Sequence, residues 1–349
     1  MTLATFYTYP IIQAPMAGGT ANPKLSAAVS NAGGLGFLVA GYKTAEEMRE
    51  EIKQTRKLTS SPFGVNLFVP SDDTIEPAIL GDYAGRLENT AKRLAVSPGE
   101  ARNDDDDWDN KLEVIIDEHI PVVSFTFGCP DSNVLDRLKK NGSYIIITVT
   151  SPQEAVKAAQ AGANALCLQG IEAGGHRSTF QNNDDAEDFS LLPLLRLVRQ
   201  QVNLPLIAAG GIMHGQDIAA LLTAGAEAIQ LGTAFLRCPE SGAKQLHKQA
   251  LKDNRFSSTT VTRAFTGRRA RGITNDFILQ YGDSAPTAYP FVHYMTKPIR
   301  KAAAEAGDME AMALWAGQGY RLAQDLPAAE IVSQLVEQAQ QALQGRKRL

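Results

Sequence analysis

Residues 162–180 read GANALCLQGIEAGGHRSTF, and this stretch determines the fold and the site that we expect. Residues 163–168 are short, apolar and preceded by a glycine turn, which is typical of a strand covered on both faces in a parallel sheet. A glycine-rich loop with one histidine, His176, follows directly. Sites in α/β proteins lie at the carboxyl ends of strands, so we expect this loop to carry function; the alternative is a surface loop with a solvated histidine.

Seven further apolar segments repeat this pattern along the chain. They are predicted as strands at residues 10–14, 34–40, 63–69, 121–127, 143–149, 205–209 and 228–231. Helical patterns separate them, and an Ala-Gly pair ends the helix in AGGLGF, AGANAL and AGAEAI. Eight strands that alternate with helices predict an α/β fold, the (β/α)8 TIM barrel.

A doubly wound parallel sheet is the alternative fold. The loop after the first strand lacks the GxGxxG pattern of dinucleotide-binding sheets. Glycine-rich segments also follow five of the strands, whereas a doubly wound sheet places its ligand at one switch point. These two observations favour the barrel.

The last third of the chain departs from the repeat. Residues 1–240 are predicted to form the barrel, and residues 241–320 to form a cap over its mouth that binds the substrate. The amphipathic helix within residues 321–349 is predicted to complete the barrel as its eighth helix.

One segment of the cap carries aromatic and basic residues at regular spacing. Tyr289, His293 and Lys297 are four positions apart, so they share one face if the segment is helical. We expect them to bind the substrate together with His176. The alternative is that the tyrosine only packs the cap onto the barrel and that the lysine is solvated.

The composition excludes some partners. The chain has 349 residues, of which 44% are hydrophobic and 21% are charged, as in ordinary globular proteins. A formal charge of −4 provides no overall attraction for nucleic acid or anionic membranes. The sequence also shows no signal peptide and no apolar run of membrane-spanning length, so we expect a cytoplasmic monomer or homodimer.

Cysteines, histidines and charge runs indicate no metal site or disulfide framework. Three cysteines are too widely spaced for a CxxC pair and are expected to be buried thiols: Cys129, Cys167 and Cys238. Three further histidines show no metal-binding spacing: His119, His214 and His247. The acidic run at residues 104–107 is predicted as a solvated loop, and the arginines within residues 263–271 as salt-bridged surface rather than a phosphate or RNA site.

The seventh and eighth strands end in AAGGI and QLGT. In TIM barrels the loops after these two strands often bind a phosphate through backbone N–H groups and a helix N-terminus. We therefore expect an anion cradle made of Gly210, Gly211, Gly232 and Thr233. The alternative is that these residues only make tight turns.

Amide side chains surround this expected cradle. Asn66, Gln169 and Gly174 could hydrogen-bond a planar heterocycle, and alternating donors and acceptors on such an edge suit an isoalloxazine. His176 would then face the ring as a base or as a cationic anchor for an anionic substrate.

The ordered motifs PIIQAPMAGG, GVNLFVP, LQGIEAGGHRSTF, LPLIAAGGI, IQLGTAFL and YPFVHYMTKPIR resemble those of class I nitronate monooxygenases over nearly the whole chain. The resemblance implies a barrel that binds FMN non-covalently and no metal, with His176 as the active-site histidine. It departs from the family pattern where HRSTF replaces HRG. The implied FMN contacts are Ala14, Pro15, Met16, Asn66, Gln169, Gly174, Gly175, Gly210, Gly211, Gln230, Leu231, Gly232, Thr233, Trp315, Gly317 and Gln318.

The resemblance also implies the reaction. Alkyl nitronates, with propionate 3-nitronate as the expected small anionic substrate, would be oxidised with O2 to a carbonyl product and nitrite. The same motifs resemble FMN-dependent enoyl-acyl-carrier-protein reductases, which is the alternative function.

Overall fold

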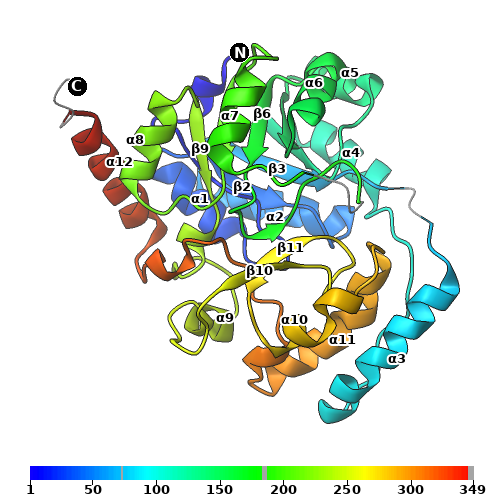
Figure 1. Cartoon of the computed structure of the whole chain (residues 1–349). Helices are drawn as coiled ribbons and strands as arrows, with labels where there is room; N and C mark the ends of the chain where they lie inside the picture. The colour runs from blue at the N-terminus through cyan, green and yellow to red at the C-terminus, as the bar shows by residue number, and fades with distance from the viewer. Residues whose placement is uncertain (72–73, 183–186, 345–349) are drawn as a thin grey trace.

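The computed structural model describes residues 1–71, 74–182 and 187–344. Eight parallel strands curve into a barrel, in the order β1-β9-β8-β6-β5-β4-β3-β2 (Figure 1). The strands are β1 (Ile11–Gln13), β2 (Gly36–Val39), β3 (Phe63–Phe68), β4 (Val122–Thr126), β5 (Tyr144–Val149), β6 (Ala165–Gln169), β8 (Leu206–Ala209) and β9 (Ala228–Leu231). A parallel bridge between Ile12 and Leu35 joins β1 to the start of β2. The predicted TIM barrel and its eight strands are confirmed.

Helices surround the barrel. They are α1 (Pro23–Asn31), α2 (Ala45–Leu58), α4 (Trp108–Asp117), α5 (Ser132–Lys140), α6 (Pro152–Ala161), α7 (Leu191–Arg199), α8 (Gly215–Thr223) and α12 (Ala328–Gln344). Several of these helices begin at a capping residue: Asn22 caps α1, and Thr44 with Glu47 forms a capping box at the start of α2. Helix α12 packs against α8 and α1; residues 345–349 lie outside the described residues.

Alternating side chains of the strands build two apolar layers. In β5, Ile145 and Ile147 belong to the large cluster between strands and helices, whereas Tyr144 and Ile146 fill the barrel interior. The same interior cluster includes Phe37 of β2 and Cys167 of β6. Polar side chains and glycines remain at the carboxyl ends, so this end of the barrel is free to form a site.

The cap is a second packed layer below the barrel in Figure 1. It contains α9 (Gln245–Ala250), β10 (Thr259–Thr262), β11 (Ala270–Ile273), α10 (Asp276–Tyr281) and α11 (Phe291–Glu305). Short 3-10 helices occur along the whole chain and are η1 (Leu3–Phe6), η2 (Thr233–Phe235), η3 (Gly282–Ser284), η4 (Met309–Ala311) and η5 (Tyr320–Leu322). Helix α3 (Pro77–Arg93), which follows β3 in sequence, packs against α11 in this layer.

The contacts of α3 are specific. The Tyr83 hydroxyl donates to the Ala264 carbonyl oxygen at 2.6 Å, and Thr90 hydrogen-bonds Tyr281, also at 2.6 Å. The apolar core of the cap therefore takes in a helix from the first hundred residues, which a boundary at residue 240 does not reproduce. Sequence order cannot show this because the packing partners are about 180 positions apart.

The cap is joined to the His176 loop by a three-stranded antiparallel sheet. Its order is β10-β11-β7, where β7 is Gly175–His176. Ala270 pairs with His176, and Arg271 pairs with Gly175. The loop expected after β6 is thus part of a sheet, and the pairing fixes the backbone of His176.

Two charged segments make more contacts within the protein than predicted. Asp106 forms an ion pair at 2.8 Å with the buried Lys111, and its other oxygen accepts from the Tyr42 backbone N–H. Arg268 and Arg271 are buried rather than on the surface. The prediction of a surface arginine cluster is therefore wrong for Arg268 and Arg271, which tertiary contacts bury. The acidic segment is a loop with Asp105 exposed, as predicted, and it departs from the prediction at Asp106, which is paired with Lys111.

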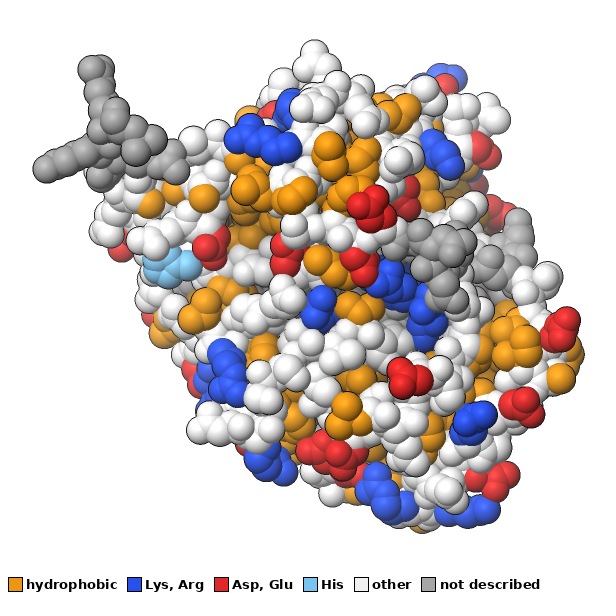
Figure 2. Space-filling view, in the orientation of Figure 1, with side chains coloured by type: hydrophobic (Ala, Val, Ile, Leu, Met, Phe, Trp, Pro, Cys, Tyr) orange, Lys and Arg blue, Asp and Glu red, His pale blue; other side chains and the backbone are white. Residues whose placement is uncertain are grey.

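On the face shown in Figure 2, acidic and basic side chains are interspersed, so this face carries no large patch of one charge sign. Among the described residues, Cys167 and Cys238 are buried, as predicted, and Cys129 is half-buried. Within that part of the chain, no helix is both long enough and apolar enough to span a bilayer.

Candidate active site

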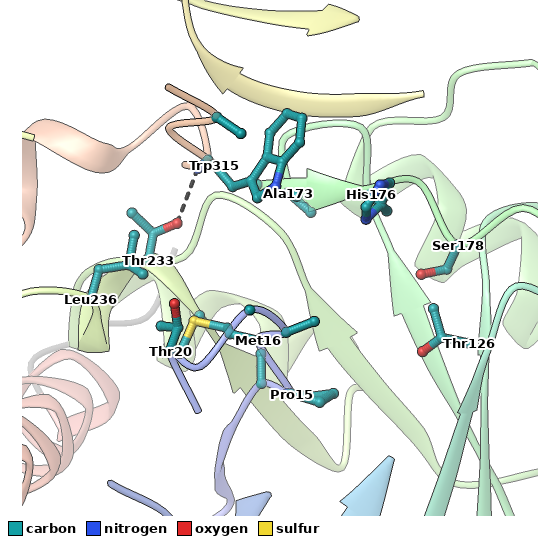
Figure 3. Close-up of a pocket in the computed structure, with 18 of the residues that line it drawn as sticks. Pro15, Met16, Thr20, Thr126, Ala173, His176, Ser178, Thr233, Leu236 and Trp315 are labelled. Atoms are coloured by element: carbon teal, nitrogen blue, oxygen red, sulfur yellow. Dashed lines mark hydrogen bonds between the residues drawn. The ribbon is translucent and has the colours of Figure 1, made fainter. Parts of the chain in front are cut away.

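A cavity of about 580 Å³ lies at the carboxyl ends of the strands, with walls from the barrel and the cap. Figure 3 shows its centre, where Met16, His176 and Trp315 come from three distant segments. Its lining includes nearly all of the predicted site residues. These are Ala14, Pro15, Met16, Asn66, Gln169, Gly174, Gly175, His176, Gly210, Gly211, Gln230, Leu231, Gly232, Thr233, His293, Lys297, Trp315 and Gly317.

Two predicted residues, Gln318 and Tyr289, do not line the cavity. Gln318 is exposed, and its backbone N–H donates to the Glu172 carbonyl oxygen at 3.0 Å. The Tyr289 hydroxyl donates to Tyr42 at 3.2 Å, and its ring packs edge-on against His176. Both residues support the site from outside, so the structure gives no direct ligand contact for either.

Backbone groups dominate one end of the cavity. Gly210 and Gly211 have φ angles of 128° and 69°, a region that favours glycine, and Gly232 with Thr233 begins η2. Among the hydrogen bonds of the described residues, none is donated by the backbone N–H of Gly211, Gly232 or Thr233. These free donors, gathered in one cavity, can bind an anion such as a phosphate.

A neighbouring turn holds this cradle in place. The Gly317 backbone N–H donates to the Thr233 side-chain oxygen at 3.0 Å, drawn as the dashed line in Figure 3. A Cβ at Gly174 would lie 2.4 Å from the backbone of Ala316, and one at Gly317 would lie 2.9 Å from the Glu172 oxygen. These glycines are therefore required because two backbone segments, residues 172–174 and 316–317, approach closely.

Asn66 presents an unsatisfied acceptor. Its amide nitrogen donates to Ser124 at 2.8 Å and to Thr126 at 3.0 Å, which fixes the side chain. Its Oδ1 atom is buried and has no partner among the described residues. Buried polar atoms are rarely left unpaired, so this oxygen suits an N–H group on a bound ligand.

Gln169 was expected to hydrogen-bond the ligand, but its amide group bonds other residues of the protein. Its Oε1 accepts from the Ser178 backbone and from Arg177, both at 3.0 Å, and its Nε2 donates to the His176 carbonyl oxygen at 2.9 Å. The amide is thus engaged in holding the histidine loop, although the residue still lines the cavity.

The hydrogen bonds of His176 determine its tautomer. Its Nε2 lies 2.9 Å from the Thr266 hydroxyl, which also lies 3.2 Å from the Arg268 carbonyl oxygen and 3.4 Å from the Arg268 backbone nitrogen. All three contacts are hydrogen bonds only if Nε2 carries the hydrogen and the hydroxyl donates to the carbonyl. The lone pair is then on Nδ1, which no described residue hydrogen-bonds.

The surroundings of His176 favour its uncharged form. Burial lowers its pKa to about 3, and the positive charges of Arg268 and Arg300 contribute in the same direction. A neutral imidazole with a free Nδ1 can accept a proton, but it cannot hold an anion by charge. Of the two predicted roles, the base is the one that this site supports.

A wall of aromatic and cationic side chains, from Tyr42 and from α11 of the cap, lines the cavity near His176. Tyr42 stacks on His293 with ring centroids 4.1 Å apart, and Arg300 donates to the His293 carbonyl oxygen at 2.8 Å. Arg300 and Lys297 both line the cavity, but Lys297 is exposed and its Nζ lies 5.9 Å from the ring centroid of Tyr294.

Sequence reasoning missed Tyr42, Thr266 and Arg300. A signal existed only for Arg300, which follows His293 by seven positions and therefore lies on the same face of α11. The described residues contain no group of three or more His, Cys, Asp or Glu side chains placed to hold a metal ion.

The fold and this site define a TIM-barrel enzyme with unpaired backbone N–H groups at one end of its cavity and a buried histidine near the other. A family model described as nitronate monooxygenase matches residues 1–338, and the chain belongs to this family. It is accordingly an oxidoreductase.

Relatives and solved structures agree with this family membership. The chain is 40% identical to probable nitronate monooxygenases of Staphylococcus saprophyticus and Staphylococcus aureus, with 96% of both chains covered in each case. A nitroalkane oxidase from Streptomyces ansochromogenes is 50% identical and covers 97% of this chain and 98% of its own, with a TM-score of 0.94. FabK from Thermotoga maritima is 28% identical over 99% and 97%, with a TM-score of 0.77.

Proposed function

We propose that this enzyme oxidises alkyl nitronates, with propionate 3-nitronate as a substrate, using bound FMN and O2 and releasing a carbonyl product and nitrite. The observation that carries the proposal is one cavity that joins free backbone donors at the cradle to the neutral base His176. Family membership supports the reaction class.

The residues present fit FMN. Gly211, Gly232 and Thr233 would bind its phosphate through their free N–H groups, and the unpaired Asn66 Oδ1 would accept from an N–H on the ring edge. When bound, FMN supplies the transfer of substrate electrons to O2. Met16 and Trp315 provide apolar surface in the same cavity.

His176 would act on the substrate. With a neutral nitroalkane, Nδ1 would remove the proton from the carbon next to the nitro group. With a nitronate, that proton is already absent, so the residue would only orient the substrate. The 50% identical nitroalkane oxidase makes the first case worth testing.

The cap would complete the substrate site. His293 lines the cavity, and Lys297 lies at its exposed edge, where a cation would attract anionic substrates. Tyr289 would act indirectly, by packing against His176 and holding Tyr42.

The test is anaerobic stopped-flow reduction of the purified protein. We expect a yellow protein with stoichiometric FMN whose flavin is reduced rapidly by propionate 3-nitronate and slowly by NADH or NADPH. A colourless protein that takes up no FMN at micromolar concentration would refute the flavin proposal.

The second candidate is an enoyl-acyl-carrier-protein reductase. The 28% identical FabK structure, aligned over nearly the whole chain, is the observation that favours it. Rapid flavin reduction by NADPH or NADH, without reduction by the nitronate, would select this function instead.

A further inference from the structure

Arg300 is a cation built into the wall of the cavity. It lies on α11, is only partly accessible, and donates through Nε to the Thr296 hydroxyl at 3.1 Å. Its Nη2 donates to the His293 carbonyl oxygen at 2.8 Å. These contacts hold the guanidinium in one orientation, whereas its Nη1 has no hydrogen-bond partner among the described residues.

The charge of Arg300 is not neutralised by the protein. Among the described residues, no carboxylate lies within ion-pair distance of it, whereas Arg93, Arg255 and Arg269 each have such a partner. Burial lowers its pKa to about 10, so the group remains charged at neutral pH. A desolvated cation without a counter-ion is unfavourable, and an anionic ligand would relieve that penalty.

The same wall supplies a second donor. Arg300 Nη2 lies 3.3 Å from His293 Nδ1, and because arginine can only donate, this nitrogen must carry the lone pair. Burial and the Arg300 charge hold the pKa of His293 well below its usual range, so the ring is neutral. Its hydrogen is therefore on Nε2, which no described residue accepts.

We propose that Arg300 binds the carboxylate of a substrate that carries a second negative charge besides its nitronate group, with His293 Nε2 as an additional donor. This inference rests on the proposed function. His176 and Arg300 line the same cavity, and the charge of Arg300 acts on His176, so one small substrate can contact both. Because Nε and Nη2 already bond the protein, Nη1 is the group of Arg300 that can donate to a carboxylate, which makes Arg300 the specificity-determining residue of this wall.

Lys297 is less suited to this role. Its side chain is exposed above Tyr294, so water screens its charge, and a solvated ammonium holds a carboxylate only weakly. Arg300 is three positions further along the same helix but partly buried, so the same charge interacts more strongly there.

The kinetic test compares propionate 3-nitronate with propyl-1-nitronate, which lacks the carboxylate. In Arg300→Met, we expect kcat/KM for the first substrate to fall about 30-fold or more, mainly through KM, and for the second to fall about 3-fold or less. Arg300→Lys retains the charge and should recover part of the loss. Lys92→Met removes a positive charge from an exposed side chain of α3 that pairs with Glu88 and does not line the cavity, and it should change neither value appreciably.

A binding test separates this proposal from the reaction itself. Isothermal titration calorimetry with propionate and with uncharged propionamide measures the carboxylate contact without turnover. We expect propionate binding to the wild type and its loss in Arg300→Met, at unchanged FMN content and melting temperature. If the wild type oxidises neither nitronate, the proposed function fails while the propionate result still stands. Equal losses for both nitronates, or propionate binding that persists in Arg300→Met and Arg300→Lys alike, would overturn the assignment.

Discussion

The two ends of the cavity are built in different ways. The cradle at Gly211, Gly232 and Thr233 consists of backbone N–H groups that end two barrel strands. The opposite wall consists of side chains, such as Tyr42 and Arg300, from segments more than 200 residues apart. The comparison shows that a backbone site follows from local sequence, whereas a side-chain site depends on how the cap packs on the barrel.

The largest expected effect lies at the side-chain end. His176→Asn removes the base, so kcat/KM for a neutral nitroalkane should fall roughly 10² to 10⁴-fold, and less for a preformed nitronate. FMN content and melting temperature should stay near the wild-type values. His119→Asn, at an exposed histidine, is the control. An unfolded or FMN-free His176→Asn protein would instead assign the residue to the fold.

The backbone end is tested by a substitution that leaves the side-chain wall intact. In Gly211→Ala, a Cβ at φ 69° would lie 3.0 Å from Glu172, so the turn should shift its N–H groups. We expect FMN to bind about 10-fold more weakly, as measured by fluorescence titration of the apoprotein. Gly225→Ala has a similar backbone penalty at φ 108° in open space, and should keep wild-type affinity. Equal loss in both variants would argue against a cradle.

Lys297→Met should have a smaller effect. An exposed ion pair contributes up to ~1 kcal/mol, so KM for propionate 3-nitronate should rise about fivefold at most, while ethyl nitronate is almost unaffected. Steady-state kinetics at low ionic strength measure the difference. If Lys297→Met exceeds Arg300→Met in this comparison, the carboxylate contacts the exposed cation instead.

The smallest expected effect concerns pH. The lowered pKa of His176, about 3, means that the neutral base persists as pH falls, because protonation occurs only well below pH 5. kcat/KM for nitroethane should therefore change less than about twofold between pH 7.5 and 5.5. A histidine with an ordinary pKa near 6.5 would lose about tenfold over the same range. Such a loss in the holoenzyme would show that bound FMN and substrate raise the pKa of His176 toward its ordinary value, and it would contradict the prediction.

Local sequence was sufficient for most of the barrel. All eight strands follow from short apolar runs, and the Thr-x-x-Glu spacing of Thr44 and Glu47 accounts for the capping box of α2. These features depend on neighbours within a few positions, so they can be inferred without knowing the fold. The cradle glycines belong to the same class, since turns at strand ends constrain φ locally.

Other roles required the assembled structure. Gln169 looked like a ligand contact, yet its amide holds the His176 loop, and Gln318 faces solvent. The contribution of α3 to the cap core also depends on contacts between distant segments. Such contacts leave no periodic signal in the sequence.

The sequence by itself determined the barrel, the position of the cavity at the strand ends and the histidine within it, because short-range periodicity and turn chemistry specify all three. Only the tertiary structure decided the state of that histidine. Its tautomer depends on Thr266, and its lost charge depends on burial beside Arg268 and Arg300. Proton affinity reflects the surrounding charges and desolvation, and the residues responsible are brought together only when the cap packs over the barrel.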